Sequence, residues 1–123
     1  MSAQKIPGVN IDAGLELYGG EMDIYVTVLE SFVTNTPAAL DKLRNVTKES
    51  LPDYVIAVHG IKSVSATIAA EEVSARAKKL ETMAKAGDLP GVLAGNPDFI
   101  KDVEILVNDI RNWLKTSGNS FSD

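Results

Sequence analysis

The chemistry open to this sequence centres on its single histidine, His59. An unperturbed imidazole titrates at about pH 6.5, so near neutral pH much of it is uncharged and one ring nitrogen carries a free lone pair. That nitrogen can attack an electrophilic centre such as phosphorus. The chain has no cysteine, which excludes disulfides, thiolate zinc sites and cysteine nucleophiles. His59 is therefore the residue on which we expect chemistry to occur.

The residues around His59 suit the transfer of a phosphoryl group. Positions three and four apart lie on one face of a helix, which places Lys62 and Ser63 beside the imidazole. A lysine in that place can contact phosphoryl oxygens and offset their charge. Gly60, Ser63 and Ala66 are small, so the ring should stand above a shallow floor that is open to another protein.

Spacing alone leaves a plainer interpretation open. A single histidine on a helix flank is usually a partly exposed surface residue, and a lysine three positions later occurs by chance in many helices. A metal site is disfavoured, because the chain has no second histidine and His59 has no acidic residue one turn away on its own helix. We therefore predict no bound metal.

Composition narrows the class of protein. A chain of 123 residues can bury one hydrophobic core, and 45% hydrophobic with 24% charged residues is typical of a folded globular domain. The net charge of −5 would repel a phosphate backbone, which argues against nucleic acid as a partner. No apolar stretch approaches the ~20 residues of a membrane span, and the N-terminus lacks a secretory pattern. We expect a cytoplasmic protein that does not insert into membranes.

The spacing of apolar residues predicts helices in the first part of the chain. A short helix should begin after Asn10 and end at glycines 19–20, where glycine can take a left-handed conformation. Its apolar side carries Ile11, Leu15 and Tyr18. A long helix follows over residues 25–43 and contains Pro37, which either kinks it or follows a cap at Thr36 that starts a new helix.

Two further helices are predicted around His59 and after it. The third has Pro52 in its first turn, and its inner stripe carries Leu51, Tyr54, Val58, Ile61, Ser65 and Ile68. This stripe leaves His59 on the flank, just outside the core. The fourth helix stops near Gly87, and its apolar residues are Val73, Ala77, Leu80 and Ala84.

The end of the chain should contain a loop, a helix and a tail. Three glycines and two prolines in residues 87–97 predict a loop with at most one helical turn around Val92 and Leu93. The last helix should end near Lys115, and its stripe carries Phe99, Val103, Leu106, Ile110 and Trp113. The polar residues 116–123 predict a disordered tail.

These elements predict an all-α fold. Four amphipathic helices with short connections pack most simply as an antiparallel four-helix bundle, here with a short extra N-terminal helix. We expect this domain to cover residues 1–115 and to be a monomer.

A longer pattern around His59 resembles the signature of histidine-containing phosphotransfer (HPt) domains. The pattern occupies residues 59–70 and continues with Leu80 and Glu81. It consists of a histidine, a large apolar residue two positions later, a lysine, small residues, an aliphatic residue at the ninth position of the signature, a turn, and a helix that ends in Leu-Glu. The similarity extends over nearly the whole chain.

The resemblance implies roles for particular residues in an HPt-like bundle. It implies that His59, exposed midway along the third helix, accepts a phosphoryl group and that Lys62 stabilises it. Glu81 falls where the family often places Gln or Glu near the ring, and Lys85 where some members place a second cation. The alternative for Glu81 and Lys85 is a solvated pair one helical turn apart.

The resemblance also implies partners. Phosphoryl groups would pass to and from the aspartate of response-regulator receiver domains, which bring their own Mg²⁺, so the chain needs no cofactor. A histidine kinase is the other expected partner, and the chain is either an independent protein or a module of such a kinase. No Gly-rich loop is followed by Lys-Ser or Lys-Thr, so we expect a phosphoryl carrier and not an enzyme with an ATP site.

Docking of a receiver is expected at an apolar patch beside His59. The candidates are Gly60, Ser63, Ala66, Leu15 and Tyr18, although Leu15 and Tyr18 can equally cover the core. A second hypothesis for the whole chain is a docking module that binds a receiver or kinase without transferring phosphate.

Two residues depart from the family pattern. Ser63 and Ala69 stand where the family usually has glycine. Serine is still small enough for a receiver to approach. Alanine adopts a positive φ less readily than glycine, so the turn between the third and fourth helices is expected to differ slightly.

Overall fold

The computed structural model describes residues 5–116, and within them all regular structure is helical. The helices are α1 (Ile11–Leu17), α2 (Met22–Asp41), α3 (Leu51–Thr67), α4 (Glu71–Lys85) and α5 (Leu89–Thr116). The prediction of an all-α chain is confirmed. The predicted tail at 116–123 lies outside the described residues, except for Thr116, which is the last residue of α5.

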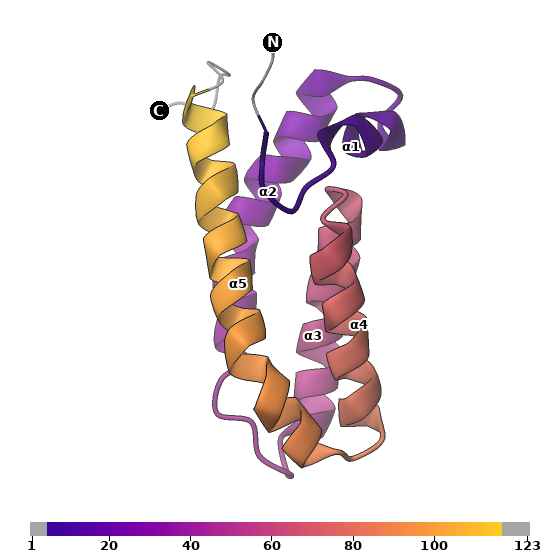
Figure 1. The fold of residues 1–123 in the computed structure, drawn as a ribbon, viewed down its shortest axis with the longest axis vertical. Helices are drawn as coiled ribbons and strands as arrows, with labels where there is room; N and C mark the ends of the chain where they lie inside the picture. Colours follow the sequence, from indigo (N-terminus) through magenta and orange to yellow (C-terminus); the bar gives the residue numbers. More distant parts are fainter. Residues whose placement is uncertain (1–4, 117–123) are drawn as a thin grey trace.

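The long helices pack side by side, as Figure 1 shows. Helix α3 lies along α4, and α5 packs against both α2 and α4. The predicted inner stripe of α3 is confirmed, because all six of its residues from Leu51 to Ile68 are buried. Burial of these stripes supplies most of the driving force for folding, at roughly 25 cal/mol for each Å² of apolar surface.

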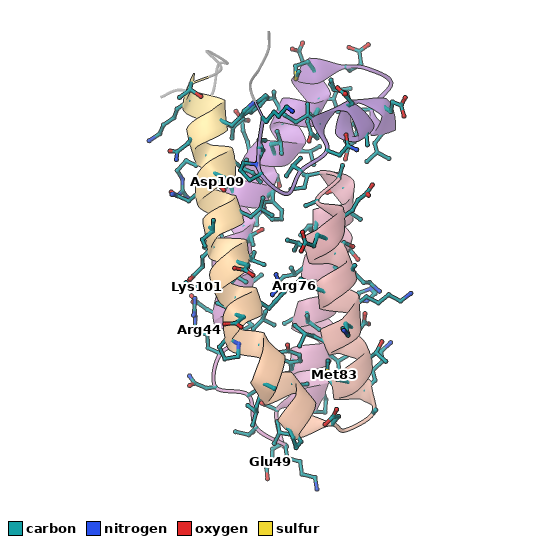
Figure 2. All side chains as sticks on the ribbon, viewed as in Figure 1. Arg44, Glu49, Arg76, Met83, Lys101 and Asp109 are labelled. Atoms are coloured by element: carbon teal, nitrogen blue, oxygen red, sulfur yellow. The ribbon has the colours of Figure 1, made fainter. Side chains whose placement is uncertain are left out.

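Two ion pairs on the surface link α5 to its neighbours. Arg76 of α4 bonds Asp102 at 2.7 Å, and its guanidinium lies 5.6 Å from the ring centre of Phe99. Arg44, which follows α2, bonds Glu104 at 2.8 Å. Figure 2 shows both arginines close to α5. Exposed pairs contribute at most about 1 kcal/mol each, so they support an arrangement that the core determines.

Helix α2 runs continuously through Pro37, so the alternative of a new helix capped by Thr36 is wrong. Pro37 is exposed, whereas Thr36 and Leu40 on the inner face are buried. The proline removes one backbone hydrogen bond, but it does so on the side where water can satisfy the freed carbonyl.

The loop predicted at residues 87–97 is wrong, because α5 begins at Leu89. Asp88 caps this helix: its carboxylate accepts a hydrogen bond from the backbone N–H of Gly91 at 3.0 Å. Pro90 lies in the first turn, where its missing N–H would have had no partner. A Cβ at position 91 would come within 3 Å of side-chain atoms of Asp88 and Met83, so one or both of these side chains would have to shift.

Buried contacts hold the remainder of this segment in the helix. Val92 is fully buried, and the Asn96 side chain accepts from the Tyr54 hydroxyl at 2.8 Å and donates to the carbonyl of Leu43 at 2.8 Å. Pro97 is accommodated inside the helix, and Figure 1 shows the orange N-terminal part of α5 inclined to the rest. Tertiary packing thus overrides the low helix propensity of the glycines and prolines.

The turn between α3 and α4 keeps the backbone that glycine would adopt. Ala69 has φ +63°, the N–H of Ala69 bonds the carbonyl of Ala66, and the N–H of Ala70 bonds the carbonyl of Ser65. This pairing is the Schellman helix ending, which requires a left-handed residue at this position. The expectation that alanine would alter the turn is therefore wrong.

The N-terminal segments hold the same turn in place. The N–H of Asn10 donates to the carbonyl of Ala69 at 3.1 Å, and the hydroxyls of Tyr18 and Tyr25 donate to the carbonyls of Thr67 and Ile68. These bonds explain how the turn tolerates a strained alanine.

Replacing Ala69 with glycine should raise the free energy of unfolding by about 0.5 kcal/mol. Relief of the left-handed alanine, about 1–2 kcal/mol, exceeds the loss of one buried methyl, about 0.8 kcal/mol. The control Ala75→Gly, on the exposed face of α4, should lower the same quantity by about 1 kcal/mol. Urea unfolding of both variants tests this, and equal losses would contradict it.

Candidate functional site

His59 lies near the middle of α3 with its side chain 54% exposed. Its neighbour Val58 is fully buried, as is Ile61 two positions later, so the core stripe passes beside the imidazole and not beneath it. A helical step of about 100° per residue produces this placement on the flank. The ring can be reached from outside the molecule.

The partner of the imidazole comes from the neighbouring helix. Glu81 of α4 accepts a hydrogen bond from the His59 ring, with 2.9 Å between Oε2 and Nδ1. The same carboxylate is paired with Lys62, at 3.0 Å from Oε1, and with Lys85, at 3.3 Å from Oε2. The Glu81 side chain is only 6% exposed, so the alternative of a solvated Glu81–Lys85 pair is wrong.

This geometry determines which ring nitrogen is free. An ionised carboxylate can only accept hydrogen bonds, so Nδ1 of His59 must carry the proton that it shares with Glu81. A neutral imidazole has one N–H and one lone pair, and the lone pair is therefore on Nε2. The exposed ring presents a nucleophilic nitrogen whose orientation is held from the opposite side.

Burial is the largest influence on the pKa of the Glu81 carboxyl and by itself raises it. Hydrogen bonds from Lys62, His59 and Lys85 act in the opposite direction and together lower this pKa to about 2. The carboxylate therefore remains charged at any pH at which the protein would work.

The cluster carries an excess of positive charge. One carboxylate and two ammonium groups leave it with a net charge of +1 when the imidazole is neutral. The Lys62 side chain is half-buried, whereas the Lys85 side chain is exposed. Such a site is suited to a group that arrives with negative charge.

The small residues predicted around the ring are exposed. Gly60, Ser63 and Ala66 all face outward on α3. A Cβ added at Gly60 would meet no atom within 4 Å, so nothing in residues 5–116 requires glycine there.

Leu15 and Tyr18 are half-buried. Leu15 packs against the core, while Tyr18 donates its hydroxyl proton to Thr67 and stacks on Tyr25 with ring centres 6.2 Å apart. Leu17 is the outward residue of this helix end, at 58% exposure. It lines a hollow of about 360 Å³ together with Lys62 and Ala66.

Sequence reasoning missed two exposed apolar residues on α3, the helix that carries His59. Ile56 is 72% exposed and Val64 is also exposed, both on the side of α3 that faces away from Lys62. The signal was present, because a helical step of about 100° puts Ile56 roughly 60° from His59 and off the core stripe. We call these two residues and Leu17, which are all exposed, the apolar rim.

Within residues 5–116 no helix combines the length and apolar character needed to cross a lipid bilayer. The same part of the chain holds no group of three His, Cys, Asp or Glu side chains arranged to bind a metal ion.

Replacing Glu81 with glutamine should lower the free energy of unfolding at pH 7 by on the order of 3 kcal/mol. The carboxyl pKa of about 2 lies below its ordinary value of 4.5, so its stabilisation is complete above pH 4.5 and is lost as pH falls toward 2. The difference between the two proteins should therefore disappear near pH 2. Urea unfolding at several pH values measures this, and a difference that does not depend on pH would refute the ion cluster.

Most of the chain matches a known family of domains. The family model described as Hpt domain matches residues 27–113. No curated protein and no solved structure matches the chain. The matched segment runs from within α2 to within α5 and includes His59, Lys62 and Glu81. Since it covers more than half of the chain, the protein belongs to the Hpt family, whose members carry phosphoryl groups on histidine in two-component phosphorelays.

Proposed function

We propose that His59 accepts a phosphoryl group from the aspartate of one receiver domain and passes it to another. The observation that carries this proposal is the exposed imidazole whose Nδ1 proton is held by the buried Glu81 carboxylate, which leaves Nε2 free to react. The matching family supports the class of reaction.

The proposed transfer is balanced in bonds and electrons. The Nε2 lone pair attacks the phosphorus of the acyl phosphate, an N–P bond forms, and the P–O bond to the receiver aspartate breaks. The electron pair of that bond leaves with the aspartate carboxylate. The Mg²⁺ that such reactions use would belong to the receiver.

Lys62 and Lys85 would stabilise the transferring group. Both ammonium groups are held near the ring by the carboxylate of Glu81, and either would turn from it toward a phosphoryl group on Nε2. Lys85 is the more mobile candidate, because its side chain is exposed and its bond at 3.3 Å is the longest of the three.

We further infer that α2 to α5 form the antiparallel four-helix bundle expected from the sequence, with α1 as the extra helix. In this arrangement the chain is a monomeric carrier between a histidine kinase and response regulators, without an ATP site of its own. The apolar rim of Ile56, Val64 and Leu17 would contact the receiver.

Incubation with a phosphorylated receiver domain should label this chain with a phosphoryl group that is stable in alkali and labile in acid. His59→Gln should abolish the label and leave receiver binding, measured by calorimetry, within about threefold of the unmodified chain. Absence of label with intact binding would favour the docking module instead.

Gly60→Ala should separate docking from stability. The free chain should gain about 1 kcal/mol, because alanine favours a helix and no atom obstructs its methyl. Transfer from the receiver should slow on the order of tenfold, since about 1.4 kcal/mol of lost contact corresponds to that factor.

Gly95→Ala is the matched control, because this helical glycine on α5 also has space for a methyl, at 3.5 Å from Leu80. It should stabilise the chain similarly and leave transfer unchanged. Equal transfer rates for both variants would remove Gly60 from the docking surface.

A further inference from the structure

The buried carboxylate of Glu81 has a consequence for the phosphorylated state, which rests on the function proposed above. When Nε2 attacks phosphorus, the ring becomes an imidazolium that carries the phosphoryl group on Nε2 and a proton on Nδ1. In water such a ring would lose the Nδ1 proton at neutral or alkaline pH. Here the proton points at Oε2 of Glu81, which lies 2.9 Å from Nδ1.

We propose that Glu81 keeps the proton on Nδ1 of phosphorylated His59, so that the phosphoryl group remains transferable at alkaline pH. Glu81 acts through His59 and is therefore a positioning residue. A charge-assisted bond of this kind is roughly twice as strong as a neutral one. Its acceptor is buried, so water competes poorly for the proton.

The retained proton matters for the step that releases the phosphoryl group. The receiver carboxylate attacks phosphorus, the N–P bond breaks, and its electron pair returns to Nε2. If Nδ1 still carries its proton, the leaving group is a neutral imidazole. If the proton has been lost, the leaving group is an imidazolate anion, which is a far stronger base and leaves much more slowly.

The cations on Glu81 prevent it from taking the proton itself. Lys62 occupies Oε1 and Lys85 shares Oε2, and both stabilise the ionised form of the carboxylate. The proton therefore stays on Nδ1, hydrogen-bonded to the carboxylate, throughout the transfer.

Charged groups near the ring come from both helices. Helix α4 contributes Glu81 and Lys85, and α3 contributes Lys62. In the phosphorylated state the positive charges of the two lysines are offset by the negative charges of Glu81 and the phosphoryl group. The hollow beside Lys62 is lined by one further acid and one further base, Glu71 and Lys78. The hollow on the other side, around Gly60, is lined by two acids and two bases whose charges sum to zero: Asp41, Asp53, Lys42 and Arg44.

The first test needs no receiver. The chain is phosphorylated with the small donor phosphoramidate, and ¹⁵N NMR follows loss of the Nδ1 proton from phosphorylated His59 as pH rises. The midpoint should lie at least about one pH unit higher in the natural chain than in Glu81→Gln, a difference that corresponds to about 1.4 kcal/mol. Coincident midpoints would overturn the proposal without affecting the proposed phosphotransfer.

The second test measures transfer from the phosphorylated chain to one receiver domain between pH 6 and 9. The ratio of rates for the natural chain and Glu81→Gln cancels any titration of the receiver. Relative to its value at pH 6, the ratio should rise on the order of tenfold by pH 8.5, whereas a ratio that does not depend on pH would indicate a merely structural role. Glu72→Gln, the same change at an exposed position of α4, should keep the natural profile.

The Glu81→Gln variant should remain folded although it lacks the ion cluster. A domain of this size has about 5–15 kcal/mol of stability, which exceeds the loss expected above. Circular dichroism at each pH verifies this, so a changed profile cannot be ascribed to unfolding.

Discussion

One buried carboxylate organises the surface on which the histidine lies. Glu81 accepts hydrogen bonds from an imidazole and two ammonium groups that come from two helices. A carboxylate buried without partners costs several kcal/mol, so the donors are required by the same burial that orients them. The constraint is mutual: the donors keep Glu81 ionised, and Glu81 fixes the ring and its tautomer. A surface histidine without this bond would rotate among rotamers and tautomers.

The rest of the fold keeps the two helices of this cluster in register. His59 and Glu81 are 22 residues apart, and the turn between their helices is the short segment that contains Ala69. Three successive carbonyls of that turn, from Thr67 to Ala69, accept hydrogen bonds from Asn10, Tyr18 and Tyr25. These three donors precede residue 27, where the match to the Hpt family begins. The N-terminal segment therefore braces the site although it lies outside the matched region.

Several surface residues make more sense for a partner than for the free chain. Glycine in the middle of a helix costs about 1 kcal/mol relative to alanine, and no contact among the described residues explains it at position 60. Ile56 of α3 exposes more than half of its surface, and so does Leu17, which lines a hollow with Lys62 and Ala66. Exposed small residues and exposed apolar residues on the helix of an accessible histidine are features expected of a surface that contacts another protein.

The sequence by itself determined the helices with clear apolar periodicity, the placement of His59 on the flank of α3 and its pairing with Lys62 on one face. These features are local, because side chains three and four apart share a face in any helix. Only the tertiary structure decided the burial of Glu81, the helical state of residues 89–97 and the left-handed Ala69. In each case a local cost is offset by groups distant in sequence. Lys62 and His59 offset the desolvation of Glu81, and Tyr54 and Leu43 bond Asn96 in the segment of low helix propensity. Asn10 bonds the strained Ala69. Such compensation depends on which elements meet in space, and residue spacing along one helix contains no information about it.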